Sequence, residues 1–409
     1  MSTIHLTGGI DVGNGYVKGL IRSADGTMTQ IDLPSGVSIE MRSNQLPTPD
    51  AQALEQVEGD FFNNLDASFT SPLVPDQYRR LFGRRSLSAN GAFEEFDVQG
   101  RLSKAEQSLS KSLVIGLFAA QALREYVKEH KKLPTDQLKV VARAALALPI
   151  DEFMRHRVSY AESFKHSDHT VTIHNFETPV FVKVSFKDIQ VIAEGASAQL
   201  AIAKKGEPLM EAMLRDLKSR GMEMEGITAK DVLAARHTIG IDIGEGTVNF
   251  PVFTGRAFNA DSSRTFGKGW GTVLSRSMDA MENARVSMPF NSRKRLAEYL
   301  TEGPNPIRRQ TYDRVKAFVD EEAQYFAQEV AVQFGHVLNI VGAETEVVYV
   351  YGGGATQVKD VLYPKLIDKV RELSGLDAFP ILYLDSSYSR HLNREGLLIA
   401  ARSAEKRGK

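Results

Sequence analysis

Residues 240–249 read Gly-Ile-Asp-Ile-Gly-Glu-Gly-Thr-Val-Asn, and residues 9–18 read Gly-Ile-Asp-Val-Gly-Asn-Gly-Tyr-Val-Lys. Both stretches share the pattern Gly-Ile-Asp-(Val or Ile)-Gly-x-Gly-x-Val. Each has a β-rich run before it and another after it, which predicts a strand, a tight glycine turn and a second strand. Asn14-Gly15 is a hairpin dipeptide that favours positive φ. The chain therefore contains two hairpins of one design, each with an aspartate near the end of its first strand.

The aspartates of these hairpins, Asp11 and Asp242, indicate what the turns bind. Glycine lets backbone N–H groups approach an anion closely, but a neighbouring carboxylate would repel a phosphate unless a cation lay between them. A single glycine turn is more often purely structural, because short motifs are common by chance. Two aligned copies favour a Mg-polyphosphate held between two lobes.

A third element supports the same interpretation. Residues 347–351 read Val-Val-Tyr-Val-Tyr, which predicts a buried strand, and Gly352 to Ala355 lead into a helix from about Val358. A strand that ends in three glycines before a helix N-terminus can hold a nucleotide phosphate.

Glu194 occupies a comparable junction. A β-rich run ends at Glu194, and a helix of small residues follows it through Leu200. Small residues allow a helix to cross another closely, as a connector between lobes requires. A glutamate at a helix N-terminus is also favoured simply by the helix dipole.

Composition limits the possible functions. A chain of 409 residues predicts two or more domains. The net charge of −1 gives no reason to expect direct nucleic-acid binding. The absence of cysteine excludes disulfides, thiolate catalysis and cysteine-ligated metals. No membrane-spanning run or signal peptide is expected, and a cytoplasmic location fits. Residues 264–272 are glycine-rich but lack P-loop spacing, and no Gly-x-Ser-x-Gly elbow occurs.

The remaining elements follow from periodicity. A capping box at residues 103–106 predicts a helix to about His130. Further predictions are strands over 139–148 and 170–186, charged helices over 205–236, and a long helix from about Pro306 to Ile340. Residues 39–100, rich in Pro, Asn, Asp and Gly, predict a small irregular subdomain inserted into the first lobe.

Two charged clusters have alternative interpretations. Arg79, Arg80, Arg84 and Arg85 are expected on a solvated face, with a subunit contact as the second possibility. His166 and His169 could bind a metal, but a surface loop is the favoured interpretation.

The ordered set of two hairpins, connector and Gly-Gly-Gly turn resembles the actin, Hsp70 and sugar-kinase superfamily. Within it the chain looks most like the bacterial plasmid-segregation actins of the ParM/StbA group. Residues 148–153, Leu-Pro-Ile-Asp-Glu-Phe, resemble the group's "LPL.EY" stretch. Residues 193–196 resemble its connector, and residues 393–396, Asn-Arg-Glu-Gly, its C-terminal "NxxG" turn. Glu245 departs from the glycine that many relatives carry, and residues 39–100 match no pattern of the group.

The resemblance implies an α/β, actin-like fold: two ribonuclease-H-like lobes with a nucleotide cleft between them. Domain I would cover residues 1–190, with an inserted subdomain at about 39–100 and a C-terminal helix at 385–409 that returns to it. Domain II would cover residues 191–384, with an inserted subdomain at about 265–335. The cofactors would be ATP or GTP and Mg²⁺.

The resemblance also implies roles for the site residues. Asp11 and Asp242 would hold Mg²⁺ mostly through water, and both would act in catalysis with Glu194, which would orient the attacking water. Lys18 would neutralise phosphate charge, or else be an exposed strand residue. The amides that would clamp the β- and γ-phosphates belong to Gly13, Asn14, Gly15, Tyr16, Gly244, Glu245, Gly246 and Thr247. The residues that would face the nucleoside and α-phosphate are Gly352, Gly353, Gly354 and Ala355.

Three functions remain open at this point. The first is a filament-forming ATPase that binds copies of itself and moves plasmid DNA through an adaptor protein bound to centromere-like DNA. This function needs neither direct DNA binding nor a membrane. The second is a small-molecule kinase of the sugar-kinase type, which would need an acidic base for a substrate hydroxyl. The third is a monomeric binding module gated by nucleotide.

Overall fold

The computed structural model describes residues 3–40, 48, 50–97, 102–222, 224–286, 290, 292–375, 379–384 and 386–407. The chain divides into two compact units. Unit 1 comprises Met1–Ala201 and Leu392–Lys409, and unit 2 comprises Ile202–His391. The domain boundaries predicted from the sequence, at residues 190 and 384, stay a prediction. Parts of the predicted segments 39–100, 265–335 and 385–409 lie outside the described residues.

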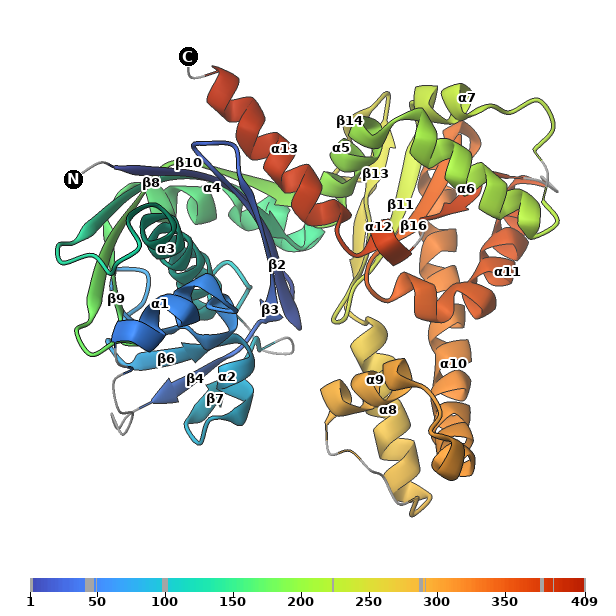
Figure 1. The fold of residues 1–409 in the computed structure, drawn as a ribbon. Helices are drawn as coiled ribbons and strands as arrows, with labels where there is room; N and C mark the ends of the chain where they lie inside the picture. Colours follow the sequence, from blue (N-terminus) through green and yellow to red (C-terminus); the bar gives the residue numbers. More distant parts are fainter. Residues whose placement is uncertain are drawn as a thin grey trace. The chain divides into compact units, whose positions relative to one another are not determined.

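The sheet of unit 1 is built on the N-terminal hairpin (Figure 1). Strand β1 (Ile4–Val12) pairs antiparallel with β2 (Tyr16–Ser23), which pairs with β3 (Met28–Pro34). On its other side β1 pairs in parallel with β8 (Leu138–Leu148), and β8 pairs in parallel with β10 (Val180–Ala193). The carboxyl ends of β1, β8 and β10 therefore meet at one edge of the sheet, the usual place for a ligand in such sheets.

The sheet of unit 1 continues beyond β10 into the segment that the sequence predicts to be irregular. The next strands in order are β9 (His169–Ile173), β5 (Asp66–Thr70), β6 (Arg79–Phe82), β4 (Val37–Glu40) and β7 (Ala92–Glu94). Helices α1 (Asp50–Glu58) and α2 (Gly83–Ser88) and the short η1 (Phe62–Asn64) lie in the same segment. Where it is described, the segment thus contains regular strands and helices, joined by loops such as residues 71–78. Strands of three to five residues are too short to show a clear alternation in the sequence.

The predicted solvated face of arginines is wrong for most of its members. Arg84 has a side chain that is 77% exposed, as predicted. Arg80 is only 1% exposed, and its guanidinium donates to Asp76 at 2.8 Å. A buried guanidinium is stable when a carboxylate lies beside it, and such a partner cannot be recognised from a local run of arginines.

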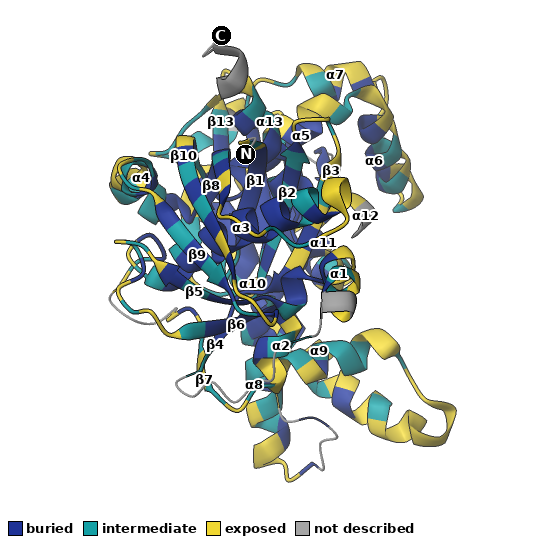
Figure 2. Cartoon of the chain, turned by 60° about the vertical axis from the view of Figure 1, so that its left-hand side comes forward, coloured by how far each residue is buried: buried dark blue, intermediate teal, exposed yellow. Residues whose placement is uncertain are grey.

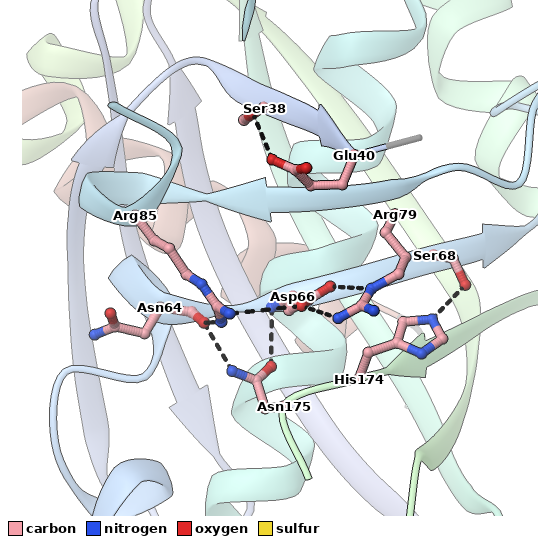
Figure 3. Close-up of polar contacts among 9 residues, drawn as sticks. All are labelled: Ser38, Glu40, Asn64, Asp66, Ser68, Arg79, Arg85, His174 and Asn175. Carbon is pink, nitrogen blue, oxygen red and sulfur yellow. Dashed lines mark hydrogen bonds and ion pairs between the residues drawn. The ribbon is translucent and has the colours of Figure 1, made fainter. Parts of the chain in front are cut away.

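Arg79 and Arg85 converge on Asp66, which is fully buried (Figure 3). Arg79 donates to both carboxylate oxygens of Asp66, through Nε at 2.9 Å and through Nη2. Asn175 accepts the backbone N–H of Asp66 at 2.9 Å and donates to the carbonyl of Asn64 at 2.8 Å. This polar network fastens β5 and β6 to the segment after β9.

Helix α3 (Ser108–His130) packs on the sheet of unit 1 and is buried along much of its length. It begins four residues later than the capping box predicts. Ser103 donates both its backbone N–H and its hydroxyl to the Glu106 carboxylate, at 2.9 and 2.7 Å. These residues close a turn that precedes the helix instead of capping it. Helix α4 (Ile150–Lys165) packs against β10 and β8.

The sheet of unit 2 repeats the arrangement around the first hairpin. Strand β11 (Thr238–Ile243) pairs antiparallel with β12 (Val248–Phe250) and β13 (Val252–Thr254), which are separated by Pro251. Proline lacks the N–H that the ladder needs, so the strand is interrupted there. On its other side β11 pairs in parallel with β16 (Val347–Tyr351), which pairs in parallel with β17 (Ile381–Tyr383). The order β12-β11-β16-β17 therefore matches β2-β1-β8-β10 of unit 1.

The remaining elements complete the chain. Two short strands, β14 (Ala257–Phe258) and β15 (Arg264–Phe266), extend the second sheet. The helices are α5 (Ala196–Lys205), α6 (Glu207–Ser219), α7 (Ala229–Ala234), α8 (Trp270–Asn283), α9 (Arg293–Glu302), η2 (Pro306–Arg308), α10 (Arg309–Val341), η3 (Gly342–Glu344), α11 (Ala355–Ser374), α12 (Ser386–Ser389) and α13 (Leu392–Arg407). Strands such as β1 and β8 are mostly buried, whereas α4, α6 and α9 expose many residues (Figure 2). Among the described helices, none combines the length and the apolarity that crossing a membrane requires.

Helix α13 lies close to the backbone of β1 and of α5. A Cβ at Gly9 would lie 2.3 Å from the backbone nitrogen of Leu398. A Cβ at Gly396 would lie 1.7 Å from the carbonyl oxygen of Ser197. Neither position has room for a side chain, so the two glycines allow α13 to cross β1 and the first turn of α5 at backbone distance.

Candidate active site

Asp11 and Glu194 lie at the same edge of the unit 1 sheet. Asp11 is the penultimate residue of β1, and Glu194 follows the last residue of β10. The backbone N–H of Glu194 donates to the carbonyl of Leu148 at 2.7 Å, which fixes it to the end of β8. Asp11 is 8% exposed and Glu194 is 7% exposed. Two predicted catalytic carboxylates are thus brought to one place by the parallel strands.

The first glycine turn is closed by a hydrogen bond from the N–H of Gly13 to the carbonyl of Tyr16, at 3.1 Å. A Cβ at Gly13 would lie 2.8 Å from that carbonyl oxygen, so the turn is tight. The positive φ expected at Asn14-Gly15 is wrong, because neither residue has a left-handed backbone. Residues 13–16 are half-buried, whereas the strands that flank them contain fully buried residues.

The second turn has the same geometry. The N–H of Gly244 donates to the carbonyl of Thr247 at 2.9 Å, and residues 244–247 are also half-buried. Asp242 is 5% exposed and lies opposite Asn249 in the hairpin. Asp11 lies opposite Lys18 at the equivalent position of the first hairpin. The two hairpins therefore place an aspartate at the same step before the turn but differ in the residue that faces it.

The Gly-Gly-Gly turn lies directly against Asp242. Gly352 has a φ of 99°, and a Cβ there would lie 2.5 Å from Oδ1 of Asp242. The N–H of Gly354 donates to the carbonyl of Ile243 at 2.8 Å. Gly353 is exposed, and Ala355 begins α11. Unit 2 thus joins its aspartate, its hairpin turn and the N-terminus of a long helix at the carboxyl ends of β11 and β16.

The start of α8 supports the second turn, a role that the sequence does not predict. The N–H of Trp270 donates to the carbonyl of Gly244 at 3.0 Å, and the N–H of Gly271 donates to that of Glu245 at 2.8 Å. A Cβ at Gly269 would lie 2.4 Å from the Glu245 carbonyl oxygen. The sequence feature that could have indicated this contact is the glycine cluster at residues 264–272, since closely spaced glycines often mark a close approach of two backbones.

Solved structures show the same chain arrangement from end to end. The crystal structure of the actin-like protein Alp7A matches with a TM-score of 0.64 and 16% identity, over 100% of this chain and 98% of that one. A ParM filament from Clostridium botulinum matches with a TM-score of 0.61 and 15% identity, over 98% and 100%. ParM from Bacillus thuringiensis with ATP matches with a TM-score of 0.58 and 16% identity, over 98% and 99%. The fold is actin-like.

This result confirms the predicted fold class and the resemblance to plasmid-segregation actins at the level of structure. No protein-family model matches the sequence, and no curated protein matches it either. The chain thus shares the actin-like fold with these proteins at only 15–16% sequence identity.

The actin-like unit 1 also contains a buried lysine beside Glu194 that the sequence does not predict. Lys104 is 4% exposed, and its Nζ lies 2.5 Å from Oε1 of Glu194. Burial opposes the charge of Lys104, but the attraction of Glu194, followed by Asp11 and Glu152, raises its pKa above the usual value. No local motif marks this residue, because its partner lies 90 positions further along the chain.

Asp11 is buried beside this ion pair. Burial raises the pKa of Asp11 above its usual value, and the negative charge of Glu194 adds to the rise. The positive charges of Lys18 and Lys104 oppose it only in part. Lys18 is half-buried and faces Asp11 across the hairpin, so it is not the exposed strand residue of the alternative interpretation.

A hydrated divalent cation and a polyphosphate fit this chemistry. A cation would relieve the unfavourable burial of Asp11, and carboxylate oxygens are the ligands that Mg²⁺ prefers. Within the described part of the chain, no set of three or more His, Asp or Glu side chains could hold a metal by itself. Ligation of Mg²⁺ by Asp11 and Asp242, mostly through water, stays a proposal.

The surface-loop interpretation holds for His166, which lies in the loop between α4 and β9, and is wrong for His169. His169 is in β9 and is fully buried. Its Nδ1 lies 2.8 Å from the Ser71 hydroxyl and its Nε2 lies 3.2 Å from the carbonyl of Phe164. His166 is exposed and pairs with Glu162 at 2.9 Å. The two rings therefore have separate partners.

Proposed function

We propose that this chain is a nucleotide-driven, filament-forming ATPase that segregates plasmid DNA through a DNA-bound adaptor protein. The observation that carries the proposal is the repeated Asp-turn-strand hairpin at the same place in two sheets, whose four strands around the hairpin have the same order. Glu194 adds a third buried acid beside Asp11. A purely structural pair of hairpins has no need for buried carboxylates at both turns.

The proposed binding roles follow from position. Asp11 and Asp242 hold Mg²⁺ largely through its water ligands, and the ion, when bound, neutralises phosphate charge. Lys18 neutralises further charge on the phosphates. The amides proposed to clamp the β- and γ-phosphates are those of Gly13, Asn14, Gly15, Tyr16, Gly244, Glu245, Gly246 and Thr247. The residues proposed to face the nucleoside and α-phosphate are Gly352, Gly353, Gly354 and Ala355.

Glu194 is the residue proposed to direct hydrolysis. Its carboxylate accepts a hydrogen bond from a water molecule and orients the oxygen toward the γ-phosphorus of ATP or GTP. The new P–O bond forms as the bond from the γ-phosphorus to the bridging oxygen breaks, and the released proton passes to phosphate or solvent. Positioning of this kind supplies much of the catalysis in phosphoryl transfer.

Polymerisation and DNA movement rest on the likeness to other proteins and on charge. One similar structure is a ParM filament and another is a ParM with ATP, which supports a nucleotide-dependent polymer here. The net charge of −1 supports a separate adaptor that binds the centromere-like DNA, in place of direct DNA binding by this chain. We propose a cytoplasmic location for the polymer.

The deciding experiment uses the purified full chain. Light scattering, pelleting and electron microscopy are followed with Mg-ATP, Mg-GTP, Mg-ADP and a non-hydrolysable ATP analogue, while phosphate release is measured. We expect filaments with a triphosphate, few or unstable ones with Mg-ADP, and slow hydrolysis. A chain that stays monomeric with the analogue at tens of micromolar and phosphorylates a small metabolite would be a kinase. Nucleotide binding without hydrolysis or assembly would indicate a binding module.

A further inference from the structure

Lys104 and Glu194 form a buried ion pair in unit 1. Nζ of Lys104 lies 2.5 Å from Oε1 of Glu194, and the two side chains are 4% and 10% exposed. Lysine and glutamate are rarely buried, and they are stable there only when each offsets the desolvation of the other. The pair therefore fixes both side chains.

The backbone around Lys104 is held in place independently of Glu194. The turn that contains it is closed by the hydrogen bonds from Ser103 to Glu106, at 2.9 and 2.7 Å. The next N–H, that of Ala105, donates to the Glu152 carboxylate at 3.3 Å. The ammonium group also lies 5.8 Å from the centre of the Phe96 ring. Lys104 thus reaches Glu194 from an anchored turn.

We propose that Lys104 is a positioning residue that holds the Glu194 carboxylate in the orientation needed to direct the attacking water. This inference rests on the function proposed above. A carboxylate with one oxygen bound to a fixed ammonium group can turn only about that contact. Carboxylate oxygens accept hydrogen bonds, so Glu194 serves as the acceptor for the water. Misplacing such a group by about 1 Å can slow a reaction on the order of 100-fold.

The test is a double-mutant cycle on hydrolysis. Lys104→Met, Glu194→Gln and the double variant are compared with the wild type by single-turnover ATP hydrolysis, with nucleotide affinity measured separately. We expect Lys104→Met to lower the rate at saturating ATP by roughly 10- to 100-fold, with nucleotide affinity nearly unchanged. In the Glu194→Gln background the same substitution should cause little further loss, because Lys104 acts through Glu194.

Lys111→Met is the matched control. Lys111 lies in the same region, but its Nζ donates to the carbonyl of Glu106 at 3.0 Å and not to Glu194. This variant should hydrolyse ATP at the wild-type rate. If Lys104→Met fails to fold because Glu194 is left unpaired, Lys104→Arg replaces it. Arginine would place the positive charge differently from the lysine ammonium group. Lys104→Arg should therefore slow hydrolysis when residue 194 is glutamate and have little effect when it is glutamine.

Two results would overturn the inference. One is an equal loss from the Lys104 substitution in both backgrounds, which would make its effect independent of Glu194. The other is an unchanged rate in a folded Lys104→Met variant. In both cases the wild type still hydrolyses ATP, so the proposed function survives. A wild type that binds nucleotide but never hydrolyses it would instead contradict the proposed function itself.

Discussion

Asp11 and Asp242 have equivalent positions but different surroundings. Each lies two residues before the first glycine of its turn. Asp11 faces Lys18 across the hairpin, whereas Asp242 faces Asn249. An amide cannot compensate a carboxylate charge as an ammonium group does. The two hairpins therefore differ in the charge of the residue opposite the aspartate.

Asp242→Ala should abolish Mg²⁺-dependent hydrolysis, because the metal loses one of its two acidic anchors. Phosphate release and metal-dependent nucleotide affinity measure the effect, with circular dichroism to verify folding. Asp25→Ala is the matched control: Asp25 also precedes a turn glycine, but it is exposed and bonds only to Thr27 and loosely to Lys128. Activity within severalfold of wild type in folded Asp242→Ala would contradict the two-aspartate metal site.

His169 should make stability depend on pH. Burial lowers the pKa of His169, and the hydrogen bond to the Phe164 carbonyl and the charge of Asp168 oppose this only in part. The Phe164 carbonyl accepts from Nε2–H. With its pKa lowered, the folded ring is neutral near pH 7, and Nδ1 then accepts from the Ser71 hydroxyl. Below about pH 6.5 the unfolded state binds more protons, and the free energy of unfolding falls as pH falls.

Urea unfolding at about pH 7.5 and about pH 5.5 checks this expectation. Wild type should lose stability at the lower pH, and His169→Gln should lose less over the same interval. His174, whose pKa burial also lowers, is present in both proteins and cancels in the comparison. Equal losses in the two proteins would show that His169 does not titrate in this range.

At the scale of elements, the crossing of α13 and α5 sets a strict steric limit. Gly396→Ala should lower the free energy of unfolding by about 1–3 kcal/mol or more, because its Cβ would lie 1.7 Å from the Ser197 carbonyl oxygen. The control is Gly335→Ala in α10, where the Cβ would meet two side chains and no backbone: Cδ of Lys369 at 3.3 Å and Cδ1 of Leu373 at 4.0 Å. Alanine favours a helix by about 1 kcal/mol over glycine, so the control should be neutral or stabilising. Equal changes in both variants would exclude a clash at the crossing.

The elements that the sequence predicts well are those specified by local patterns. The two hairpins, the strand before Gly352 and the placement of Glu194 at a strand end were all predictable, because the glycines and the β-rich runs are adjacent in the chain. Lys104 and the start of α8 were not, because they reach the site through folding of distant segments. The burial of Arg80 was also unpredictable, since its environment depends on strand pairing far along the sheet.

At the scale of the whole molecule, the proposed polymer should respond to the rate of hydrolysis. In the proposed function a bound γ-phosphate favours one state of the chain, and its loss releases that preference, as in other nucleotide switches. Head-to-tail contacts between copies do not close on themselves and so give filaments. The lifetime of a filament should then follow the lifetime of its bound triphosphate.

Glu194→Ala tests this link. The variant should bind ATP and assemble, but its filaments should outlast those of wild type, because hydrolysis is delayed while phosphate contacts remain. The decay of light scattering, once ATP becomes limiting, measures filament lifetime. Phosphate release, followed in parallel, measures hydrolysis. Glu177→Ala, which removes an exposed glutamate of the same unit, serves as the control. If filaments of Glu194→Ala decay at the wild-type rate although phosphate release is slower, filament disassembly does not depend on hydrolysis.

Unit 1 consists of two stretches that a ribosome makes at very different times. Helix α13 packs on β1, and its Leu397 and Ala401 form an apolar cluster with Ala145 and Ala147. Residues 202–391 are synthesised in between, which takes roughly 10–40 s at cellular rates of translation. During this interval the nascent unit exposes the apolar surface that α13 will cover, where chaperones can bind it. The last step in folding the first unit therefore waits until residues 392–407 have been synthesised.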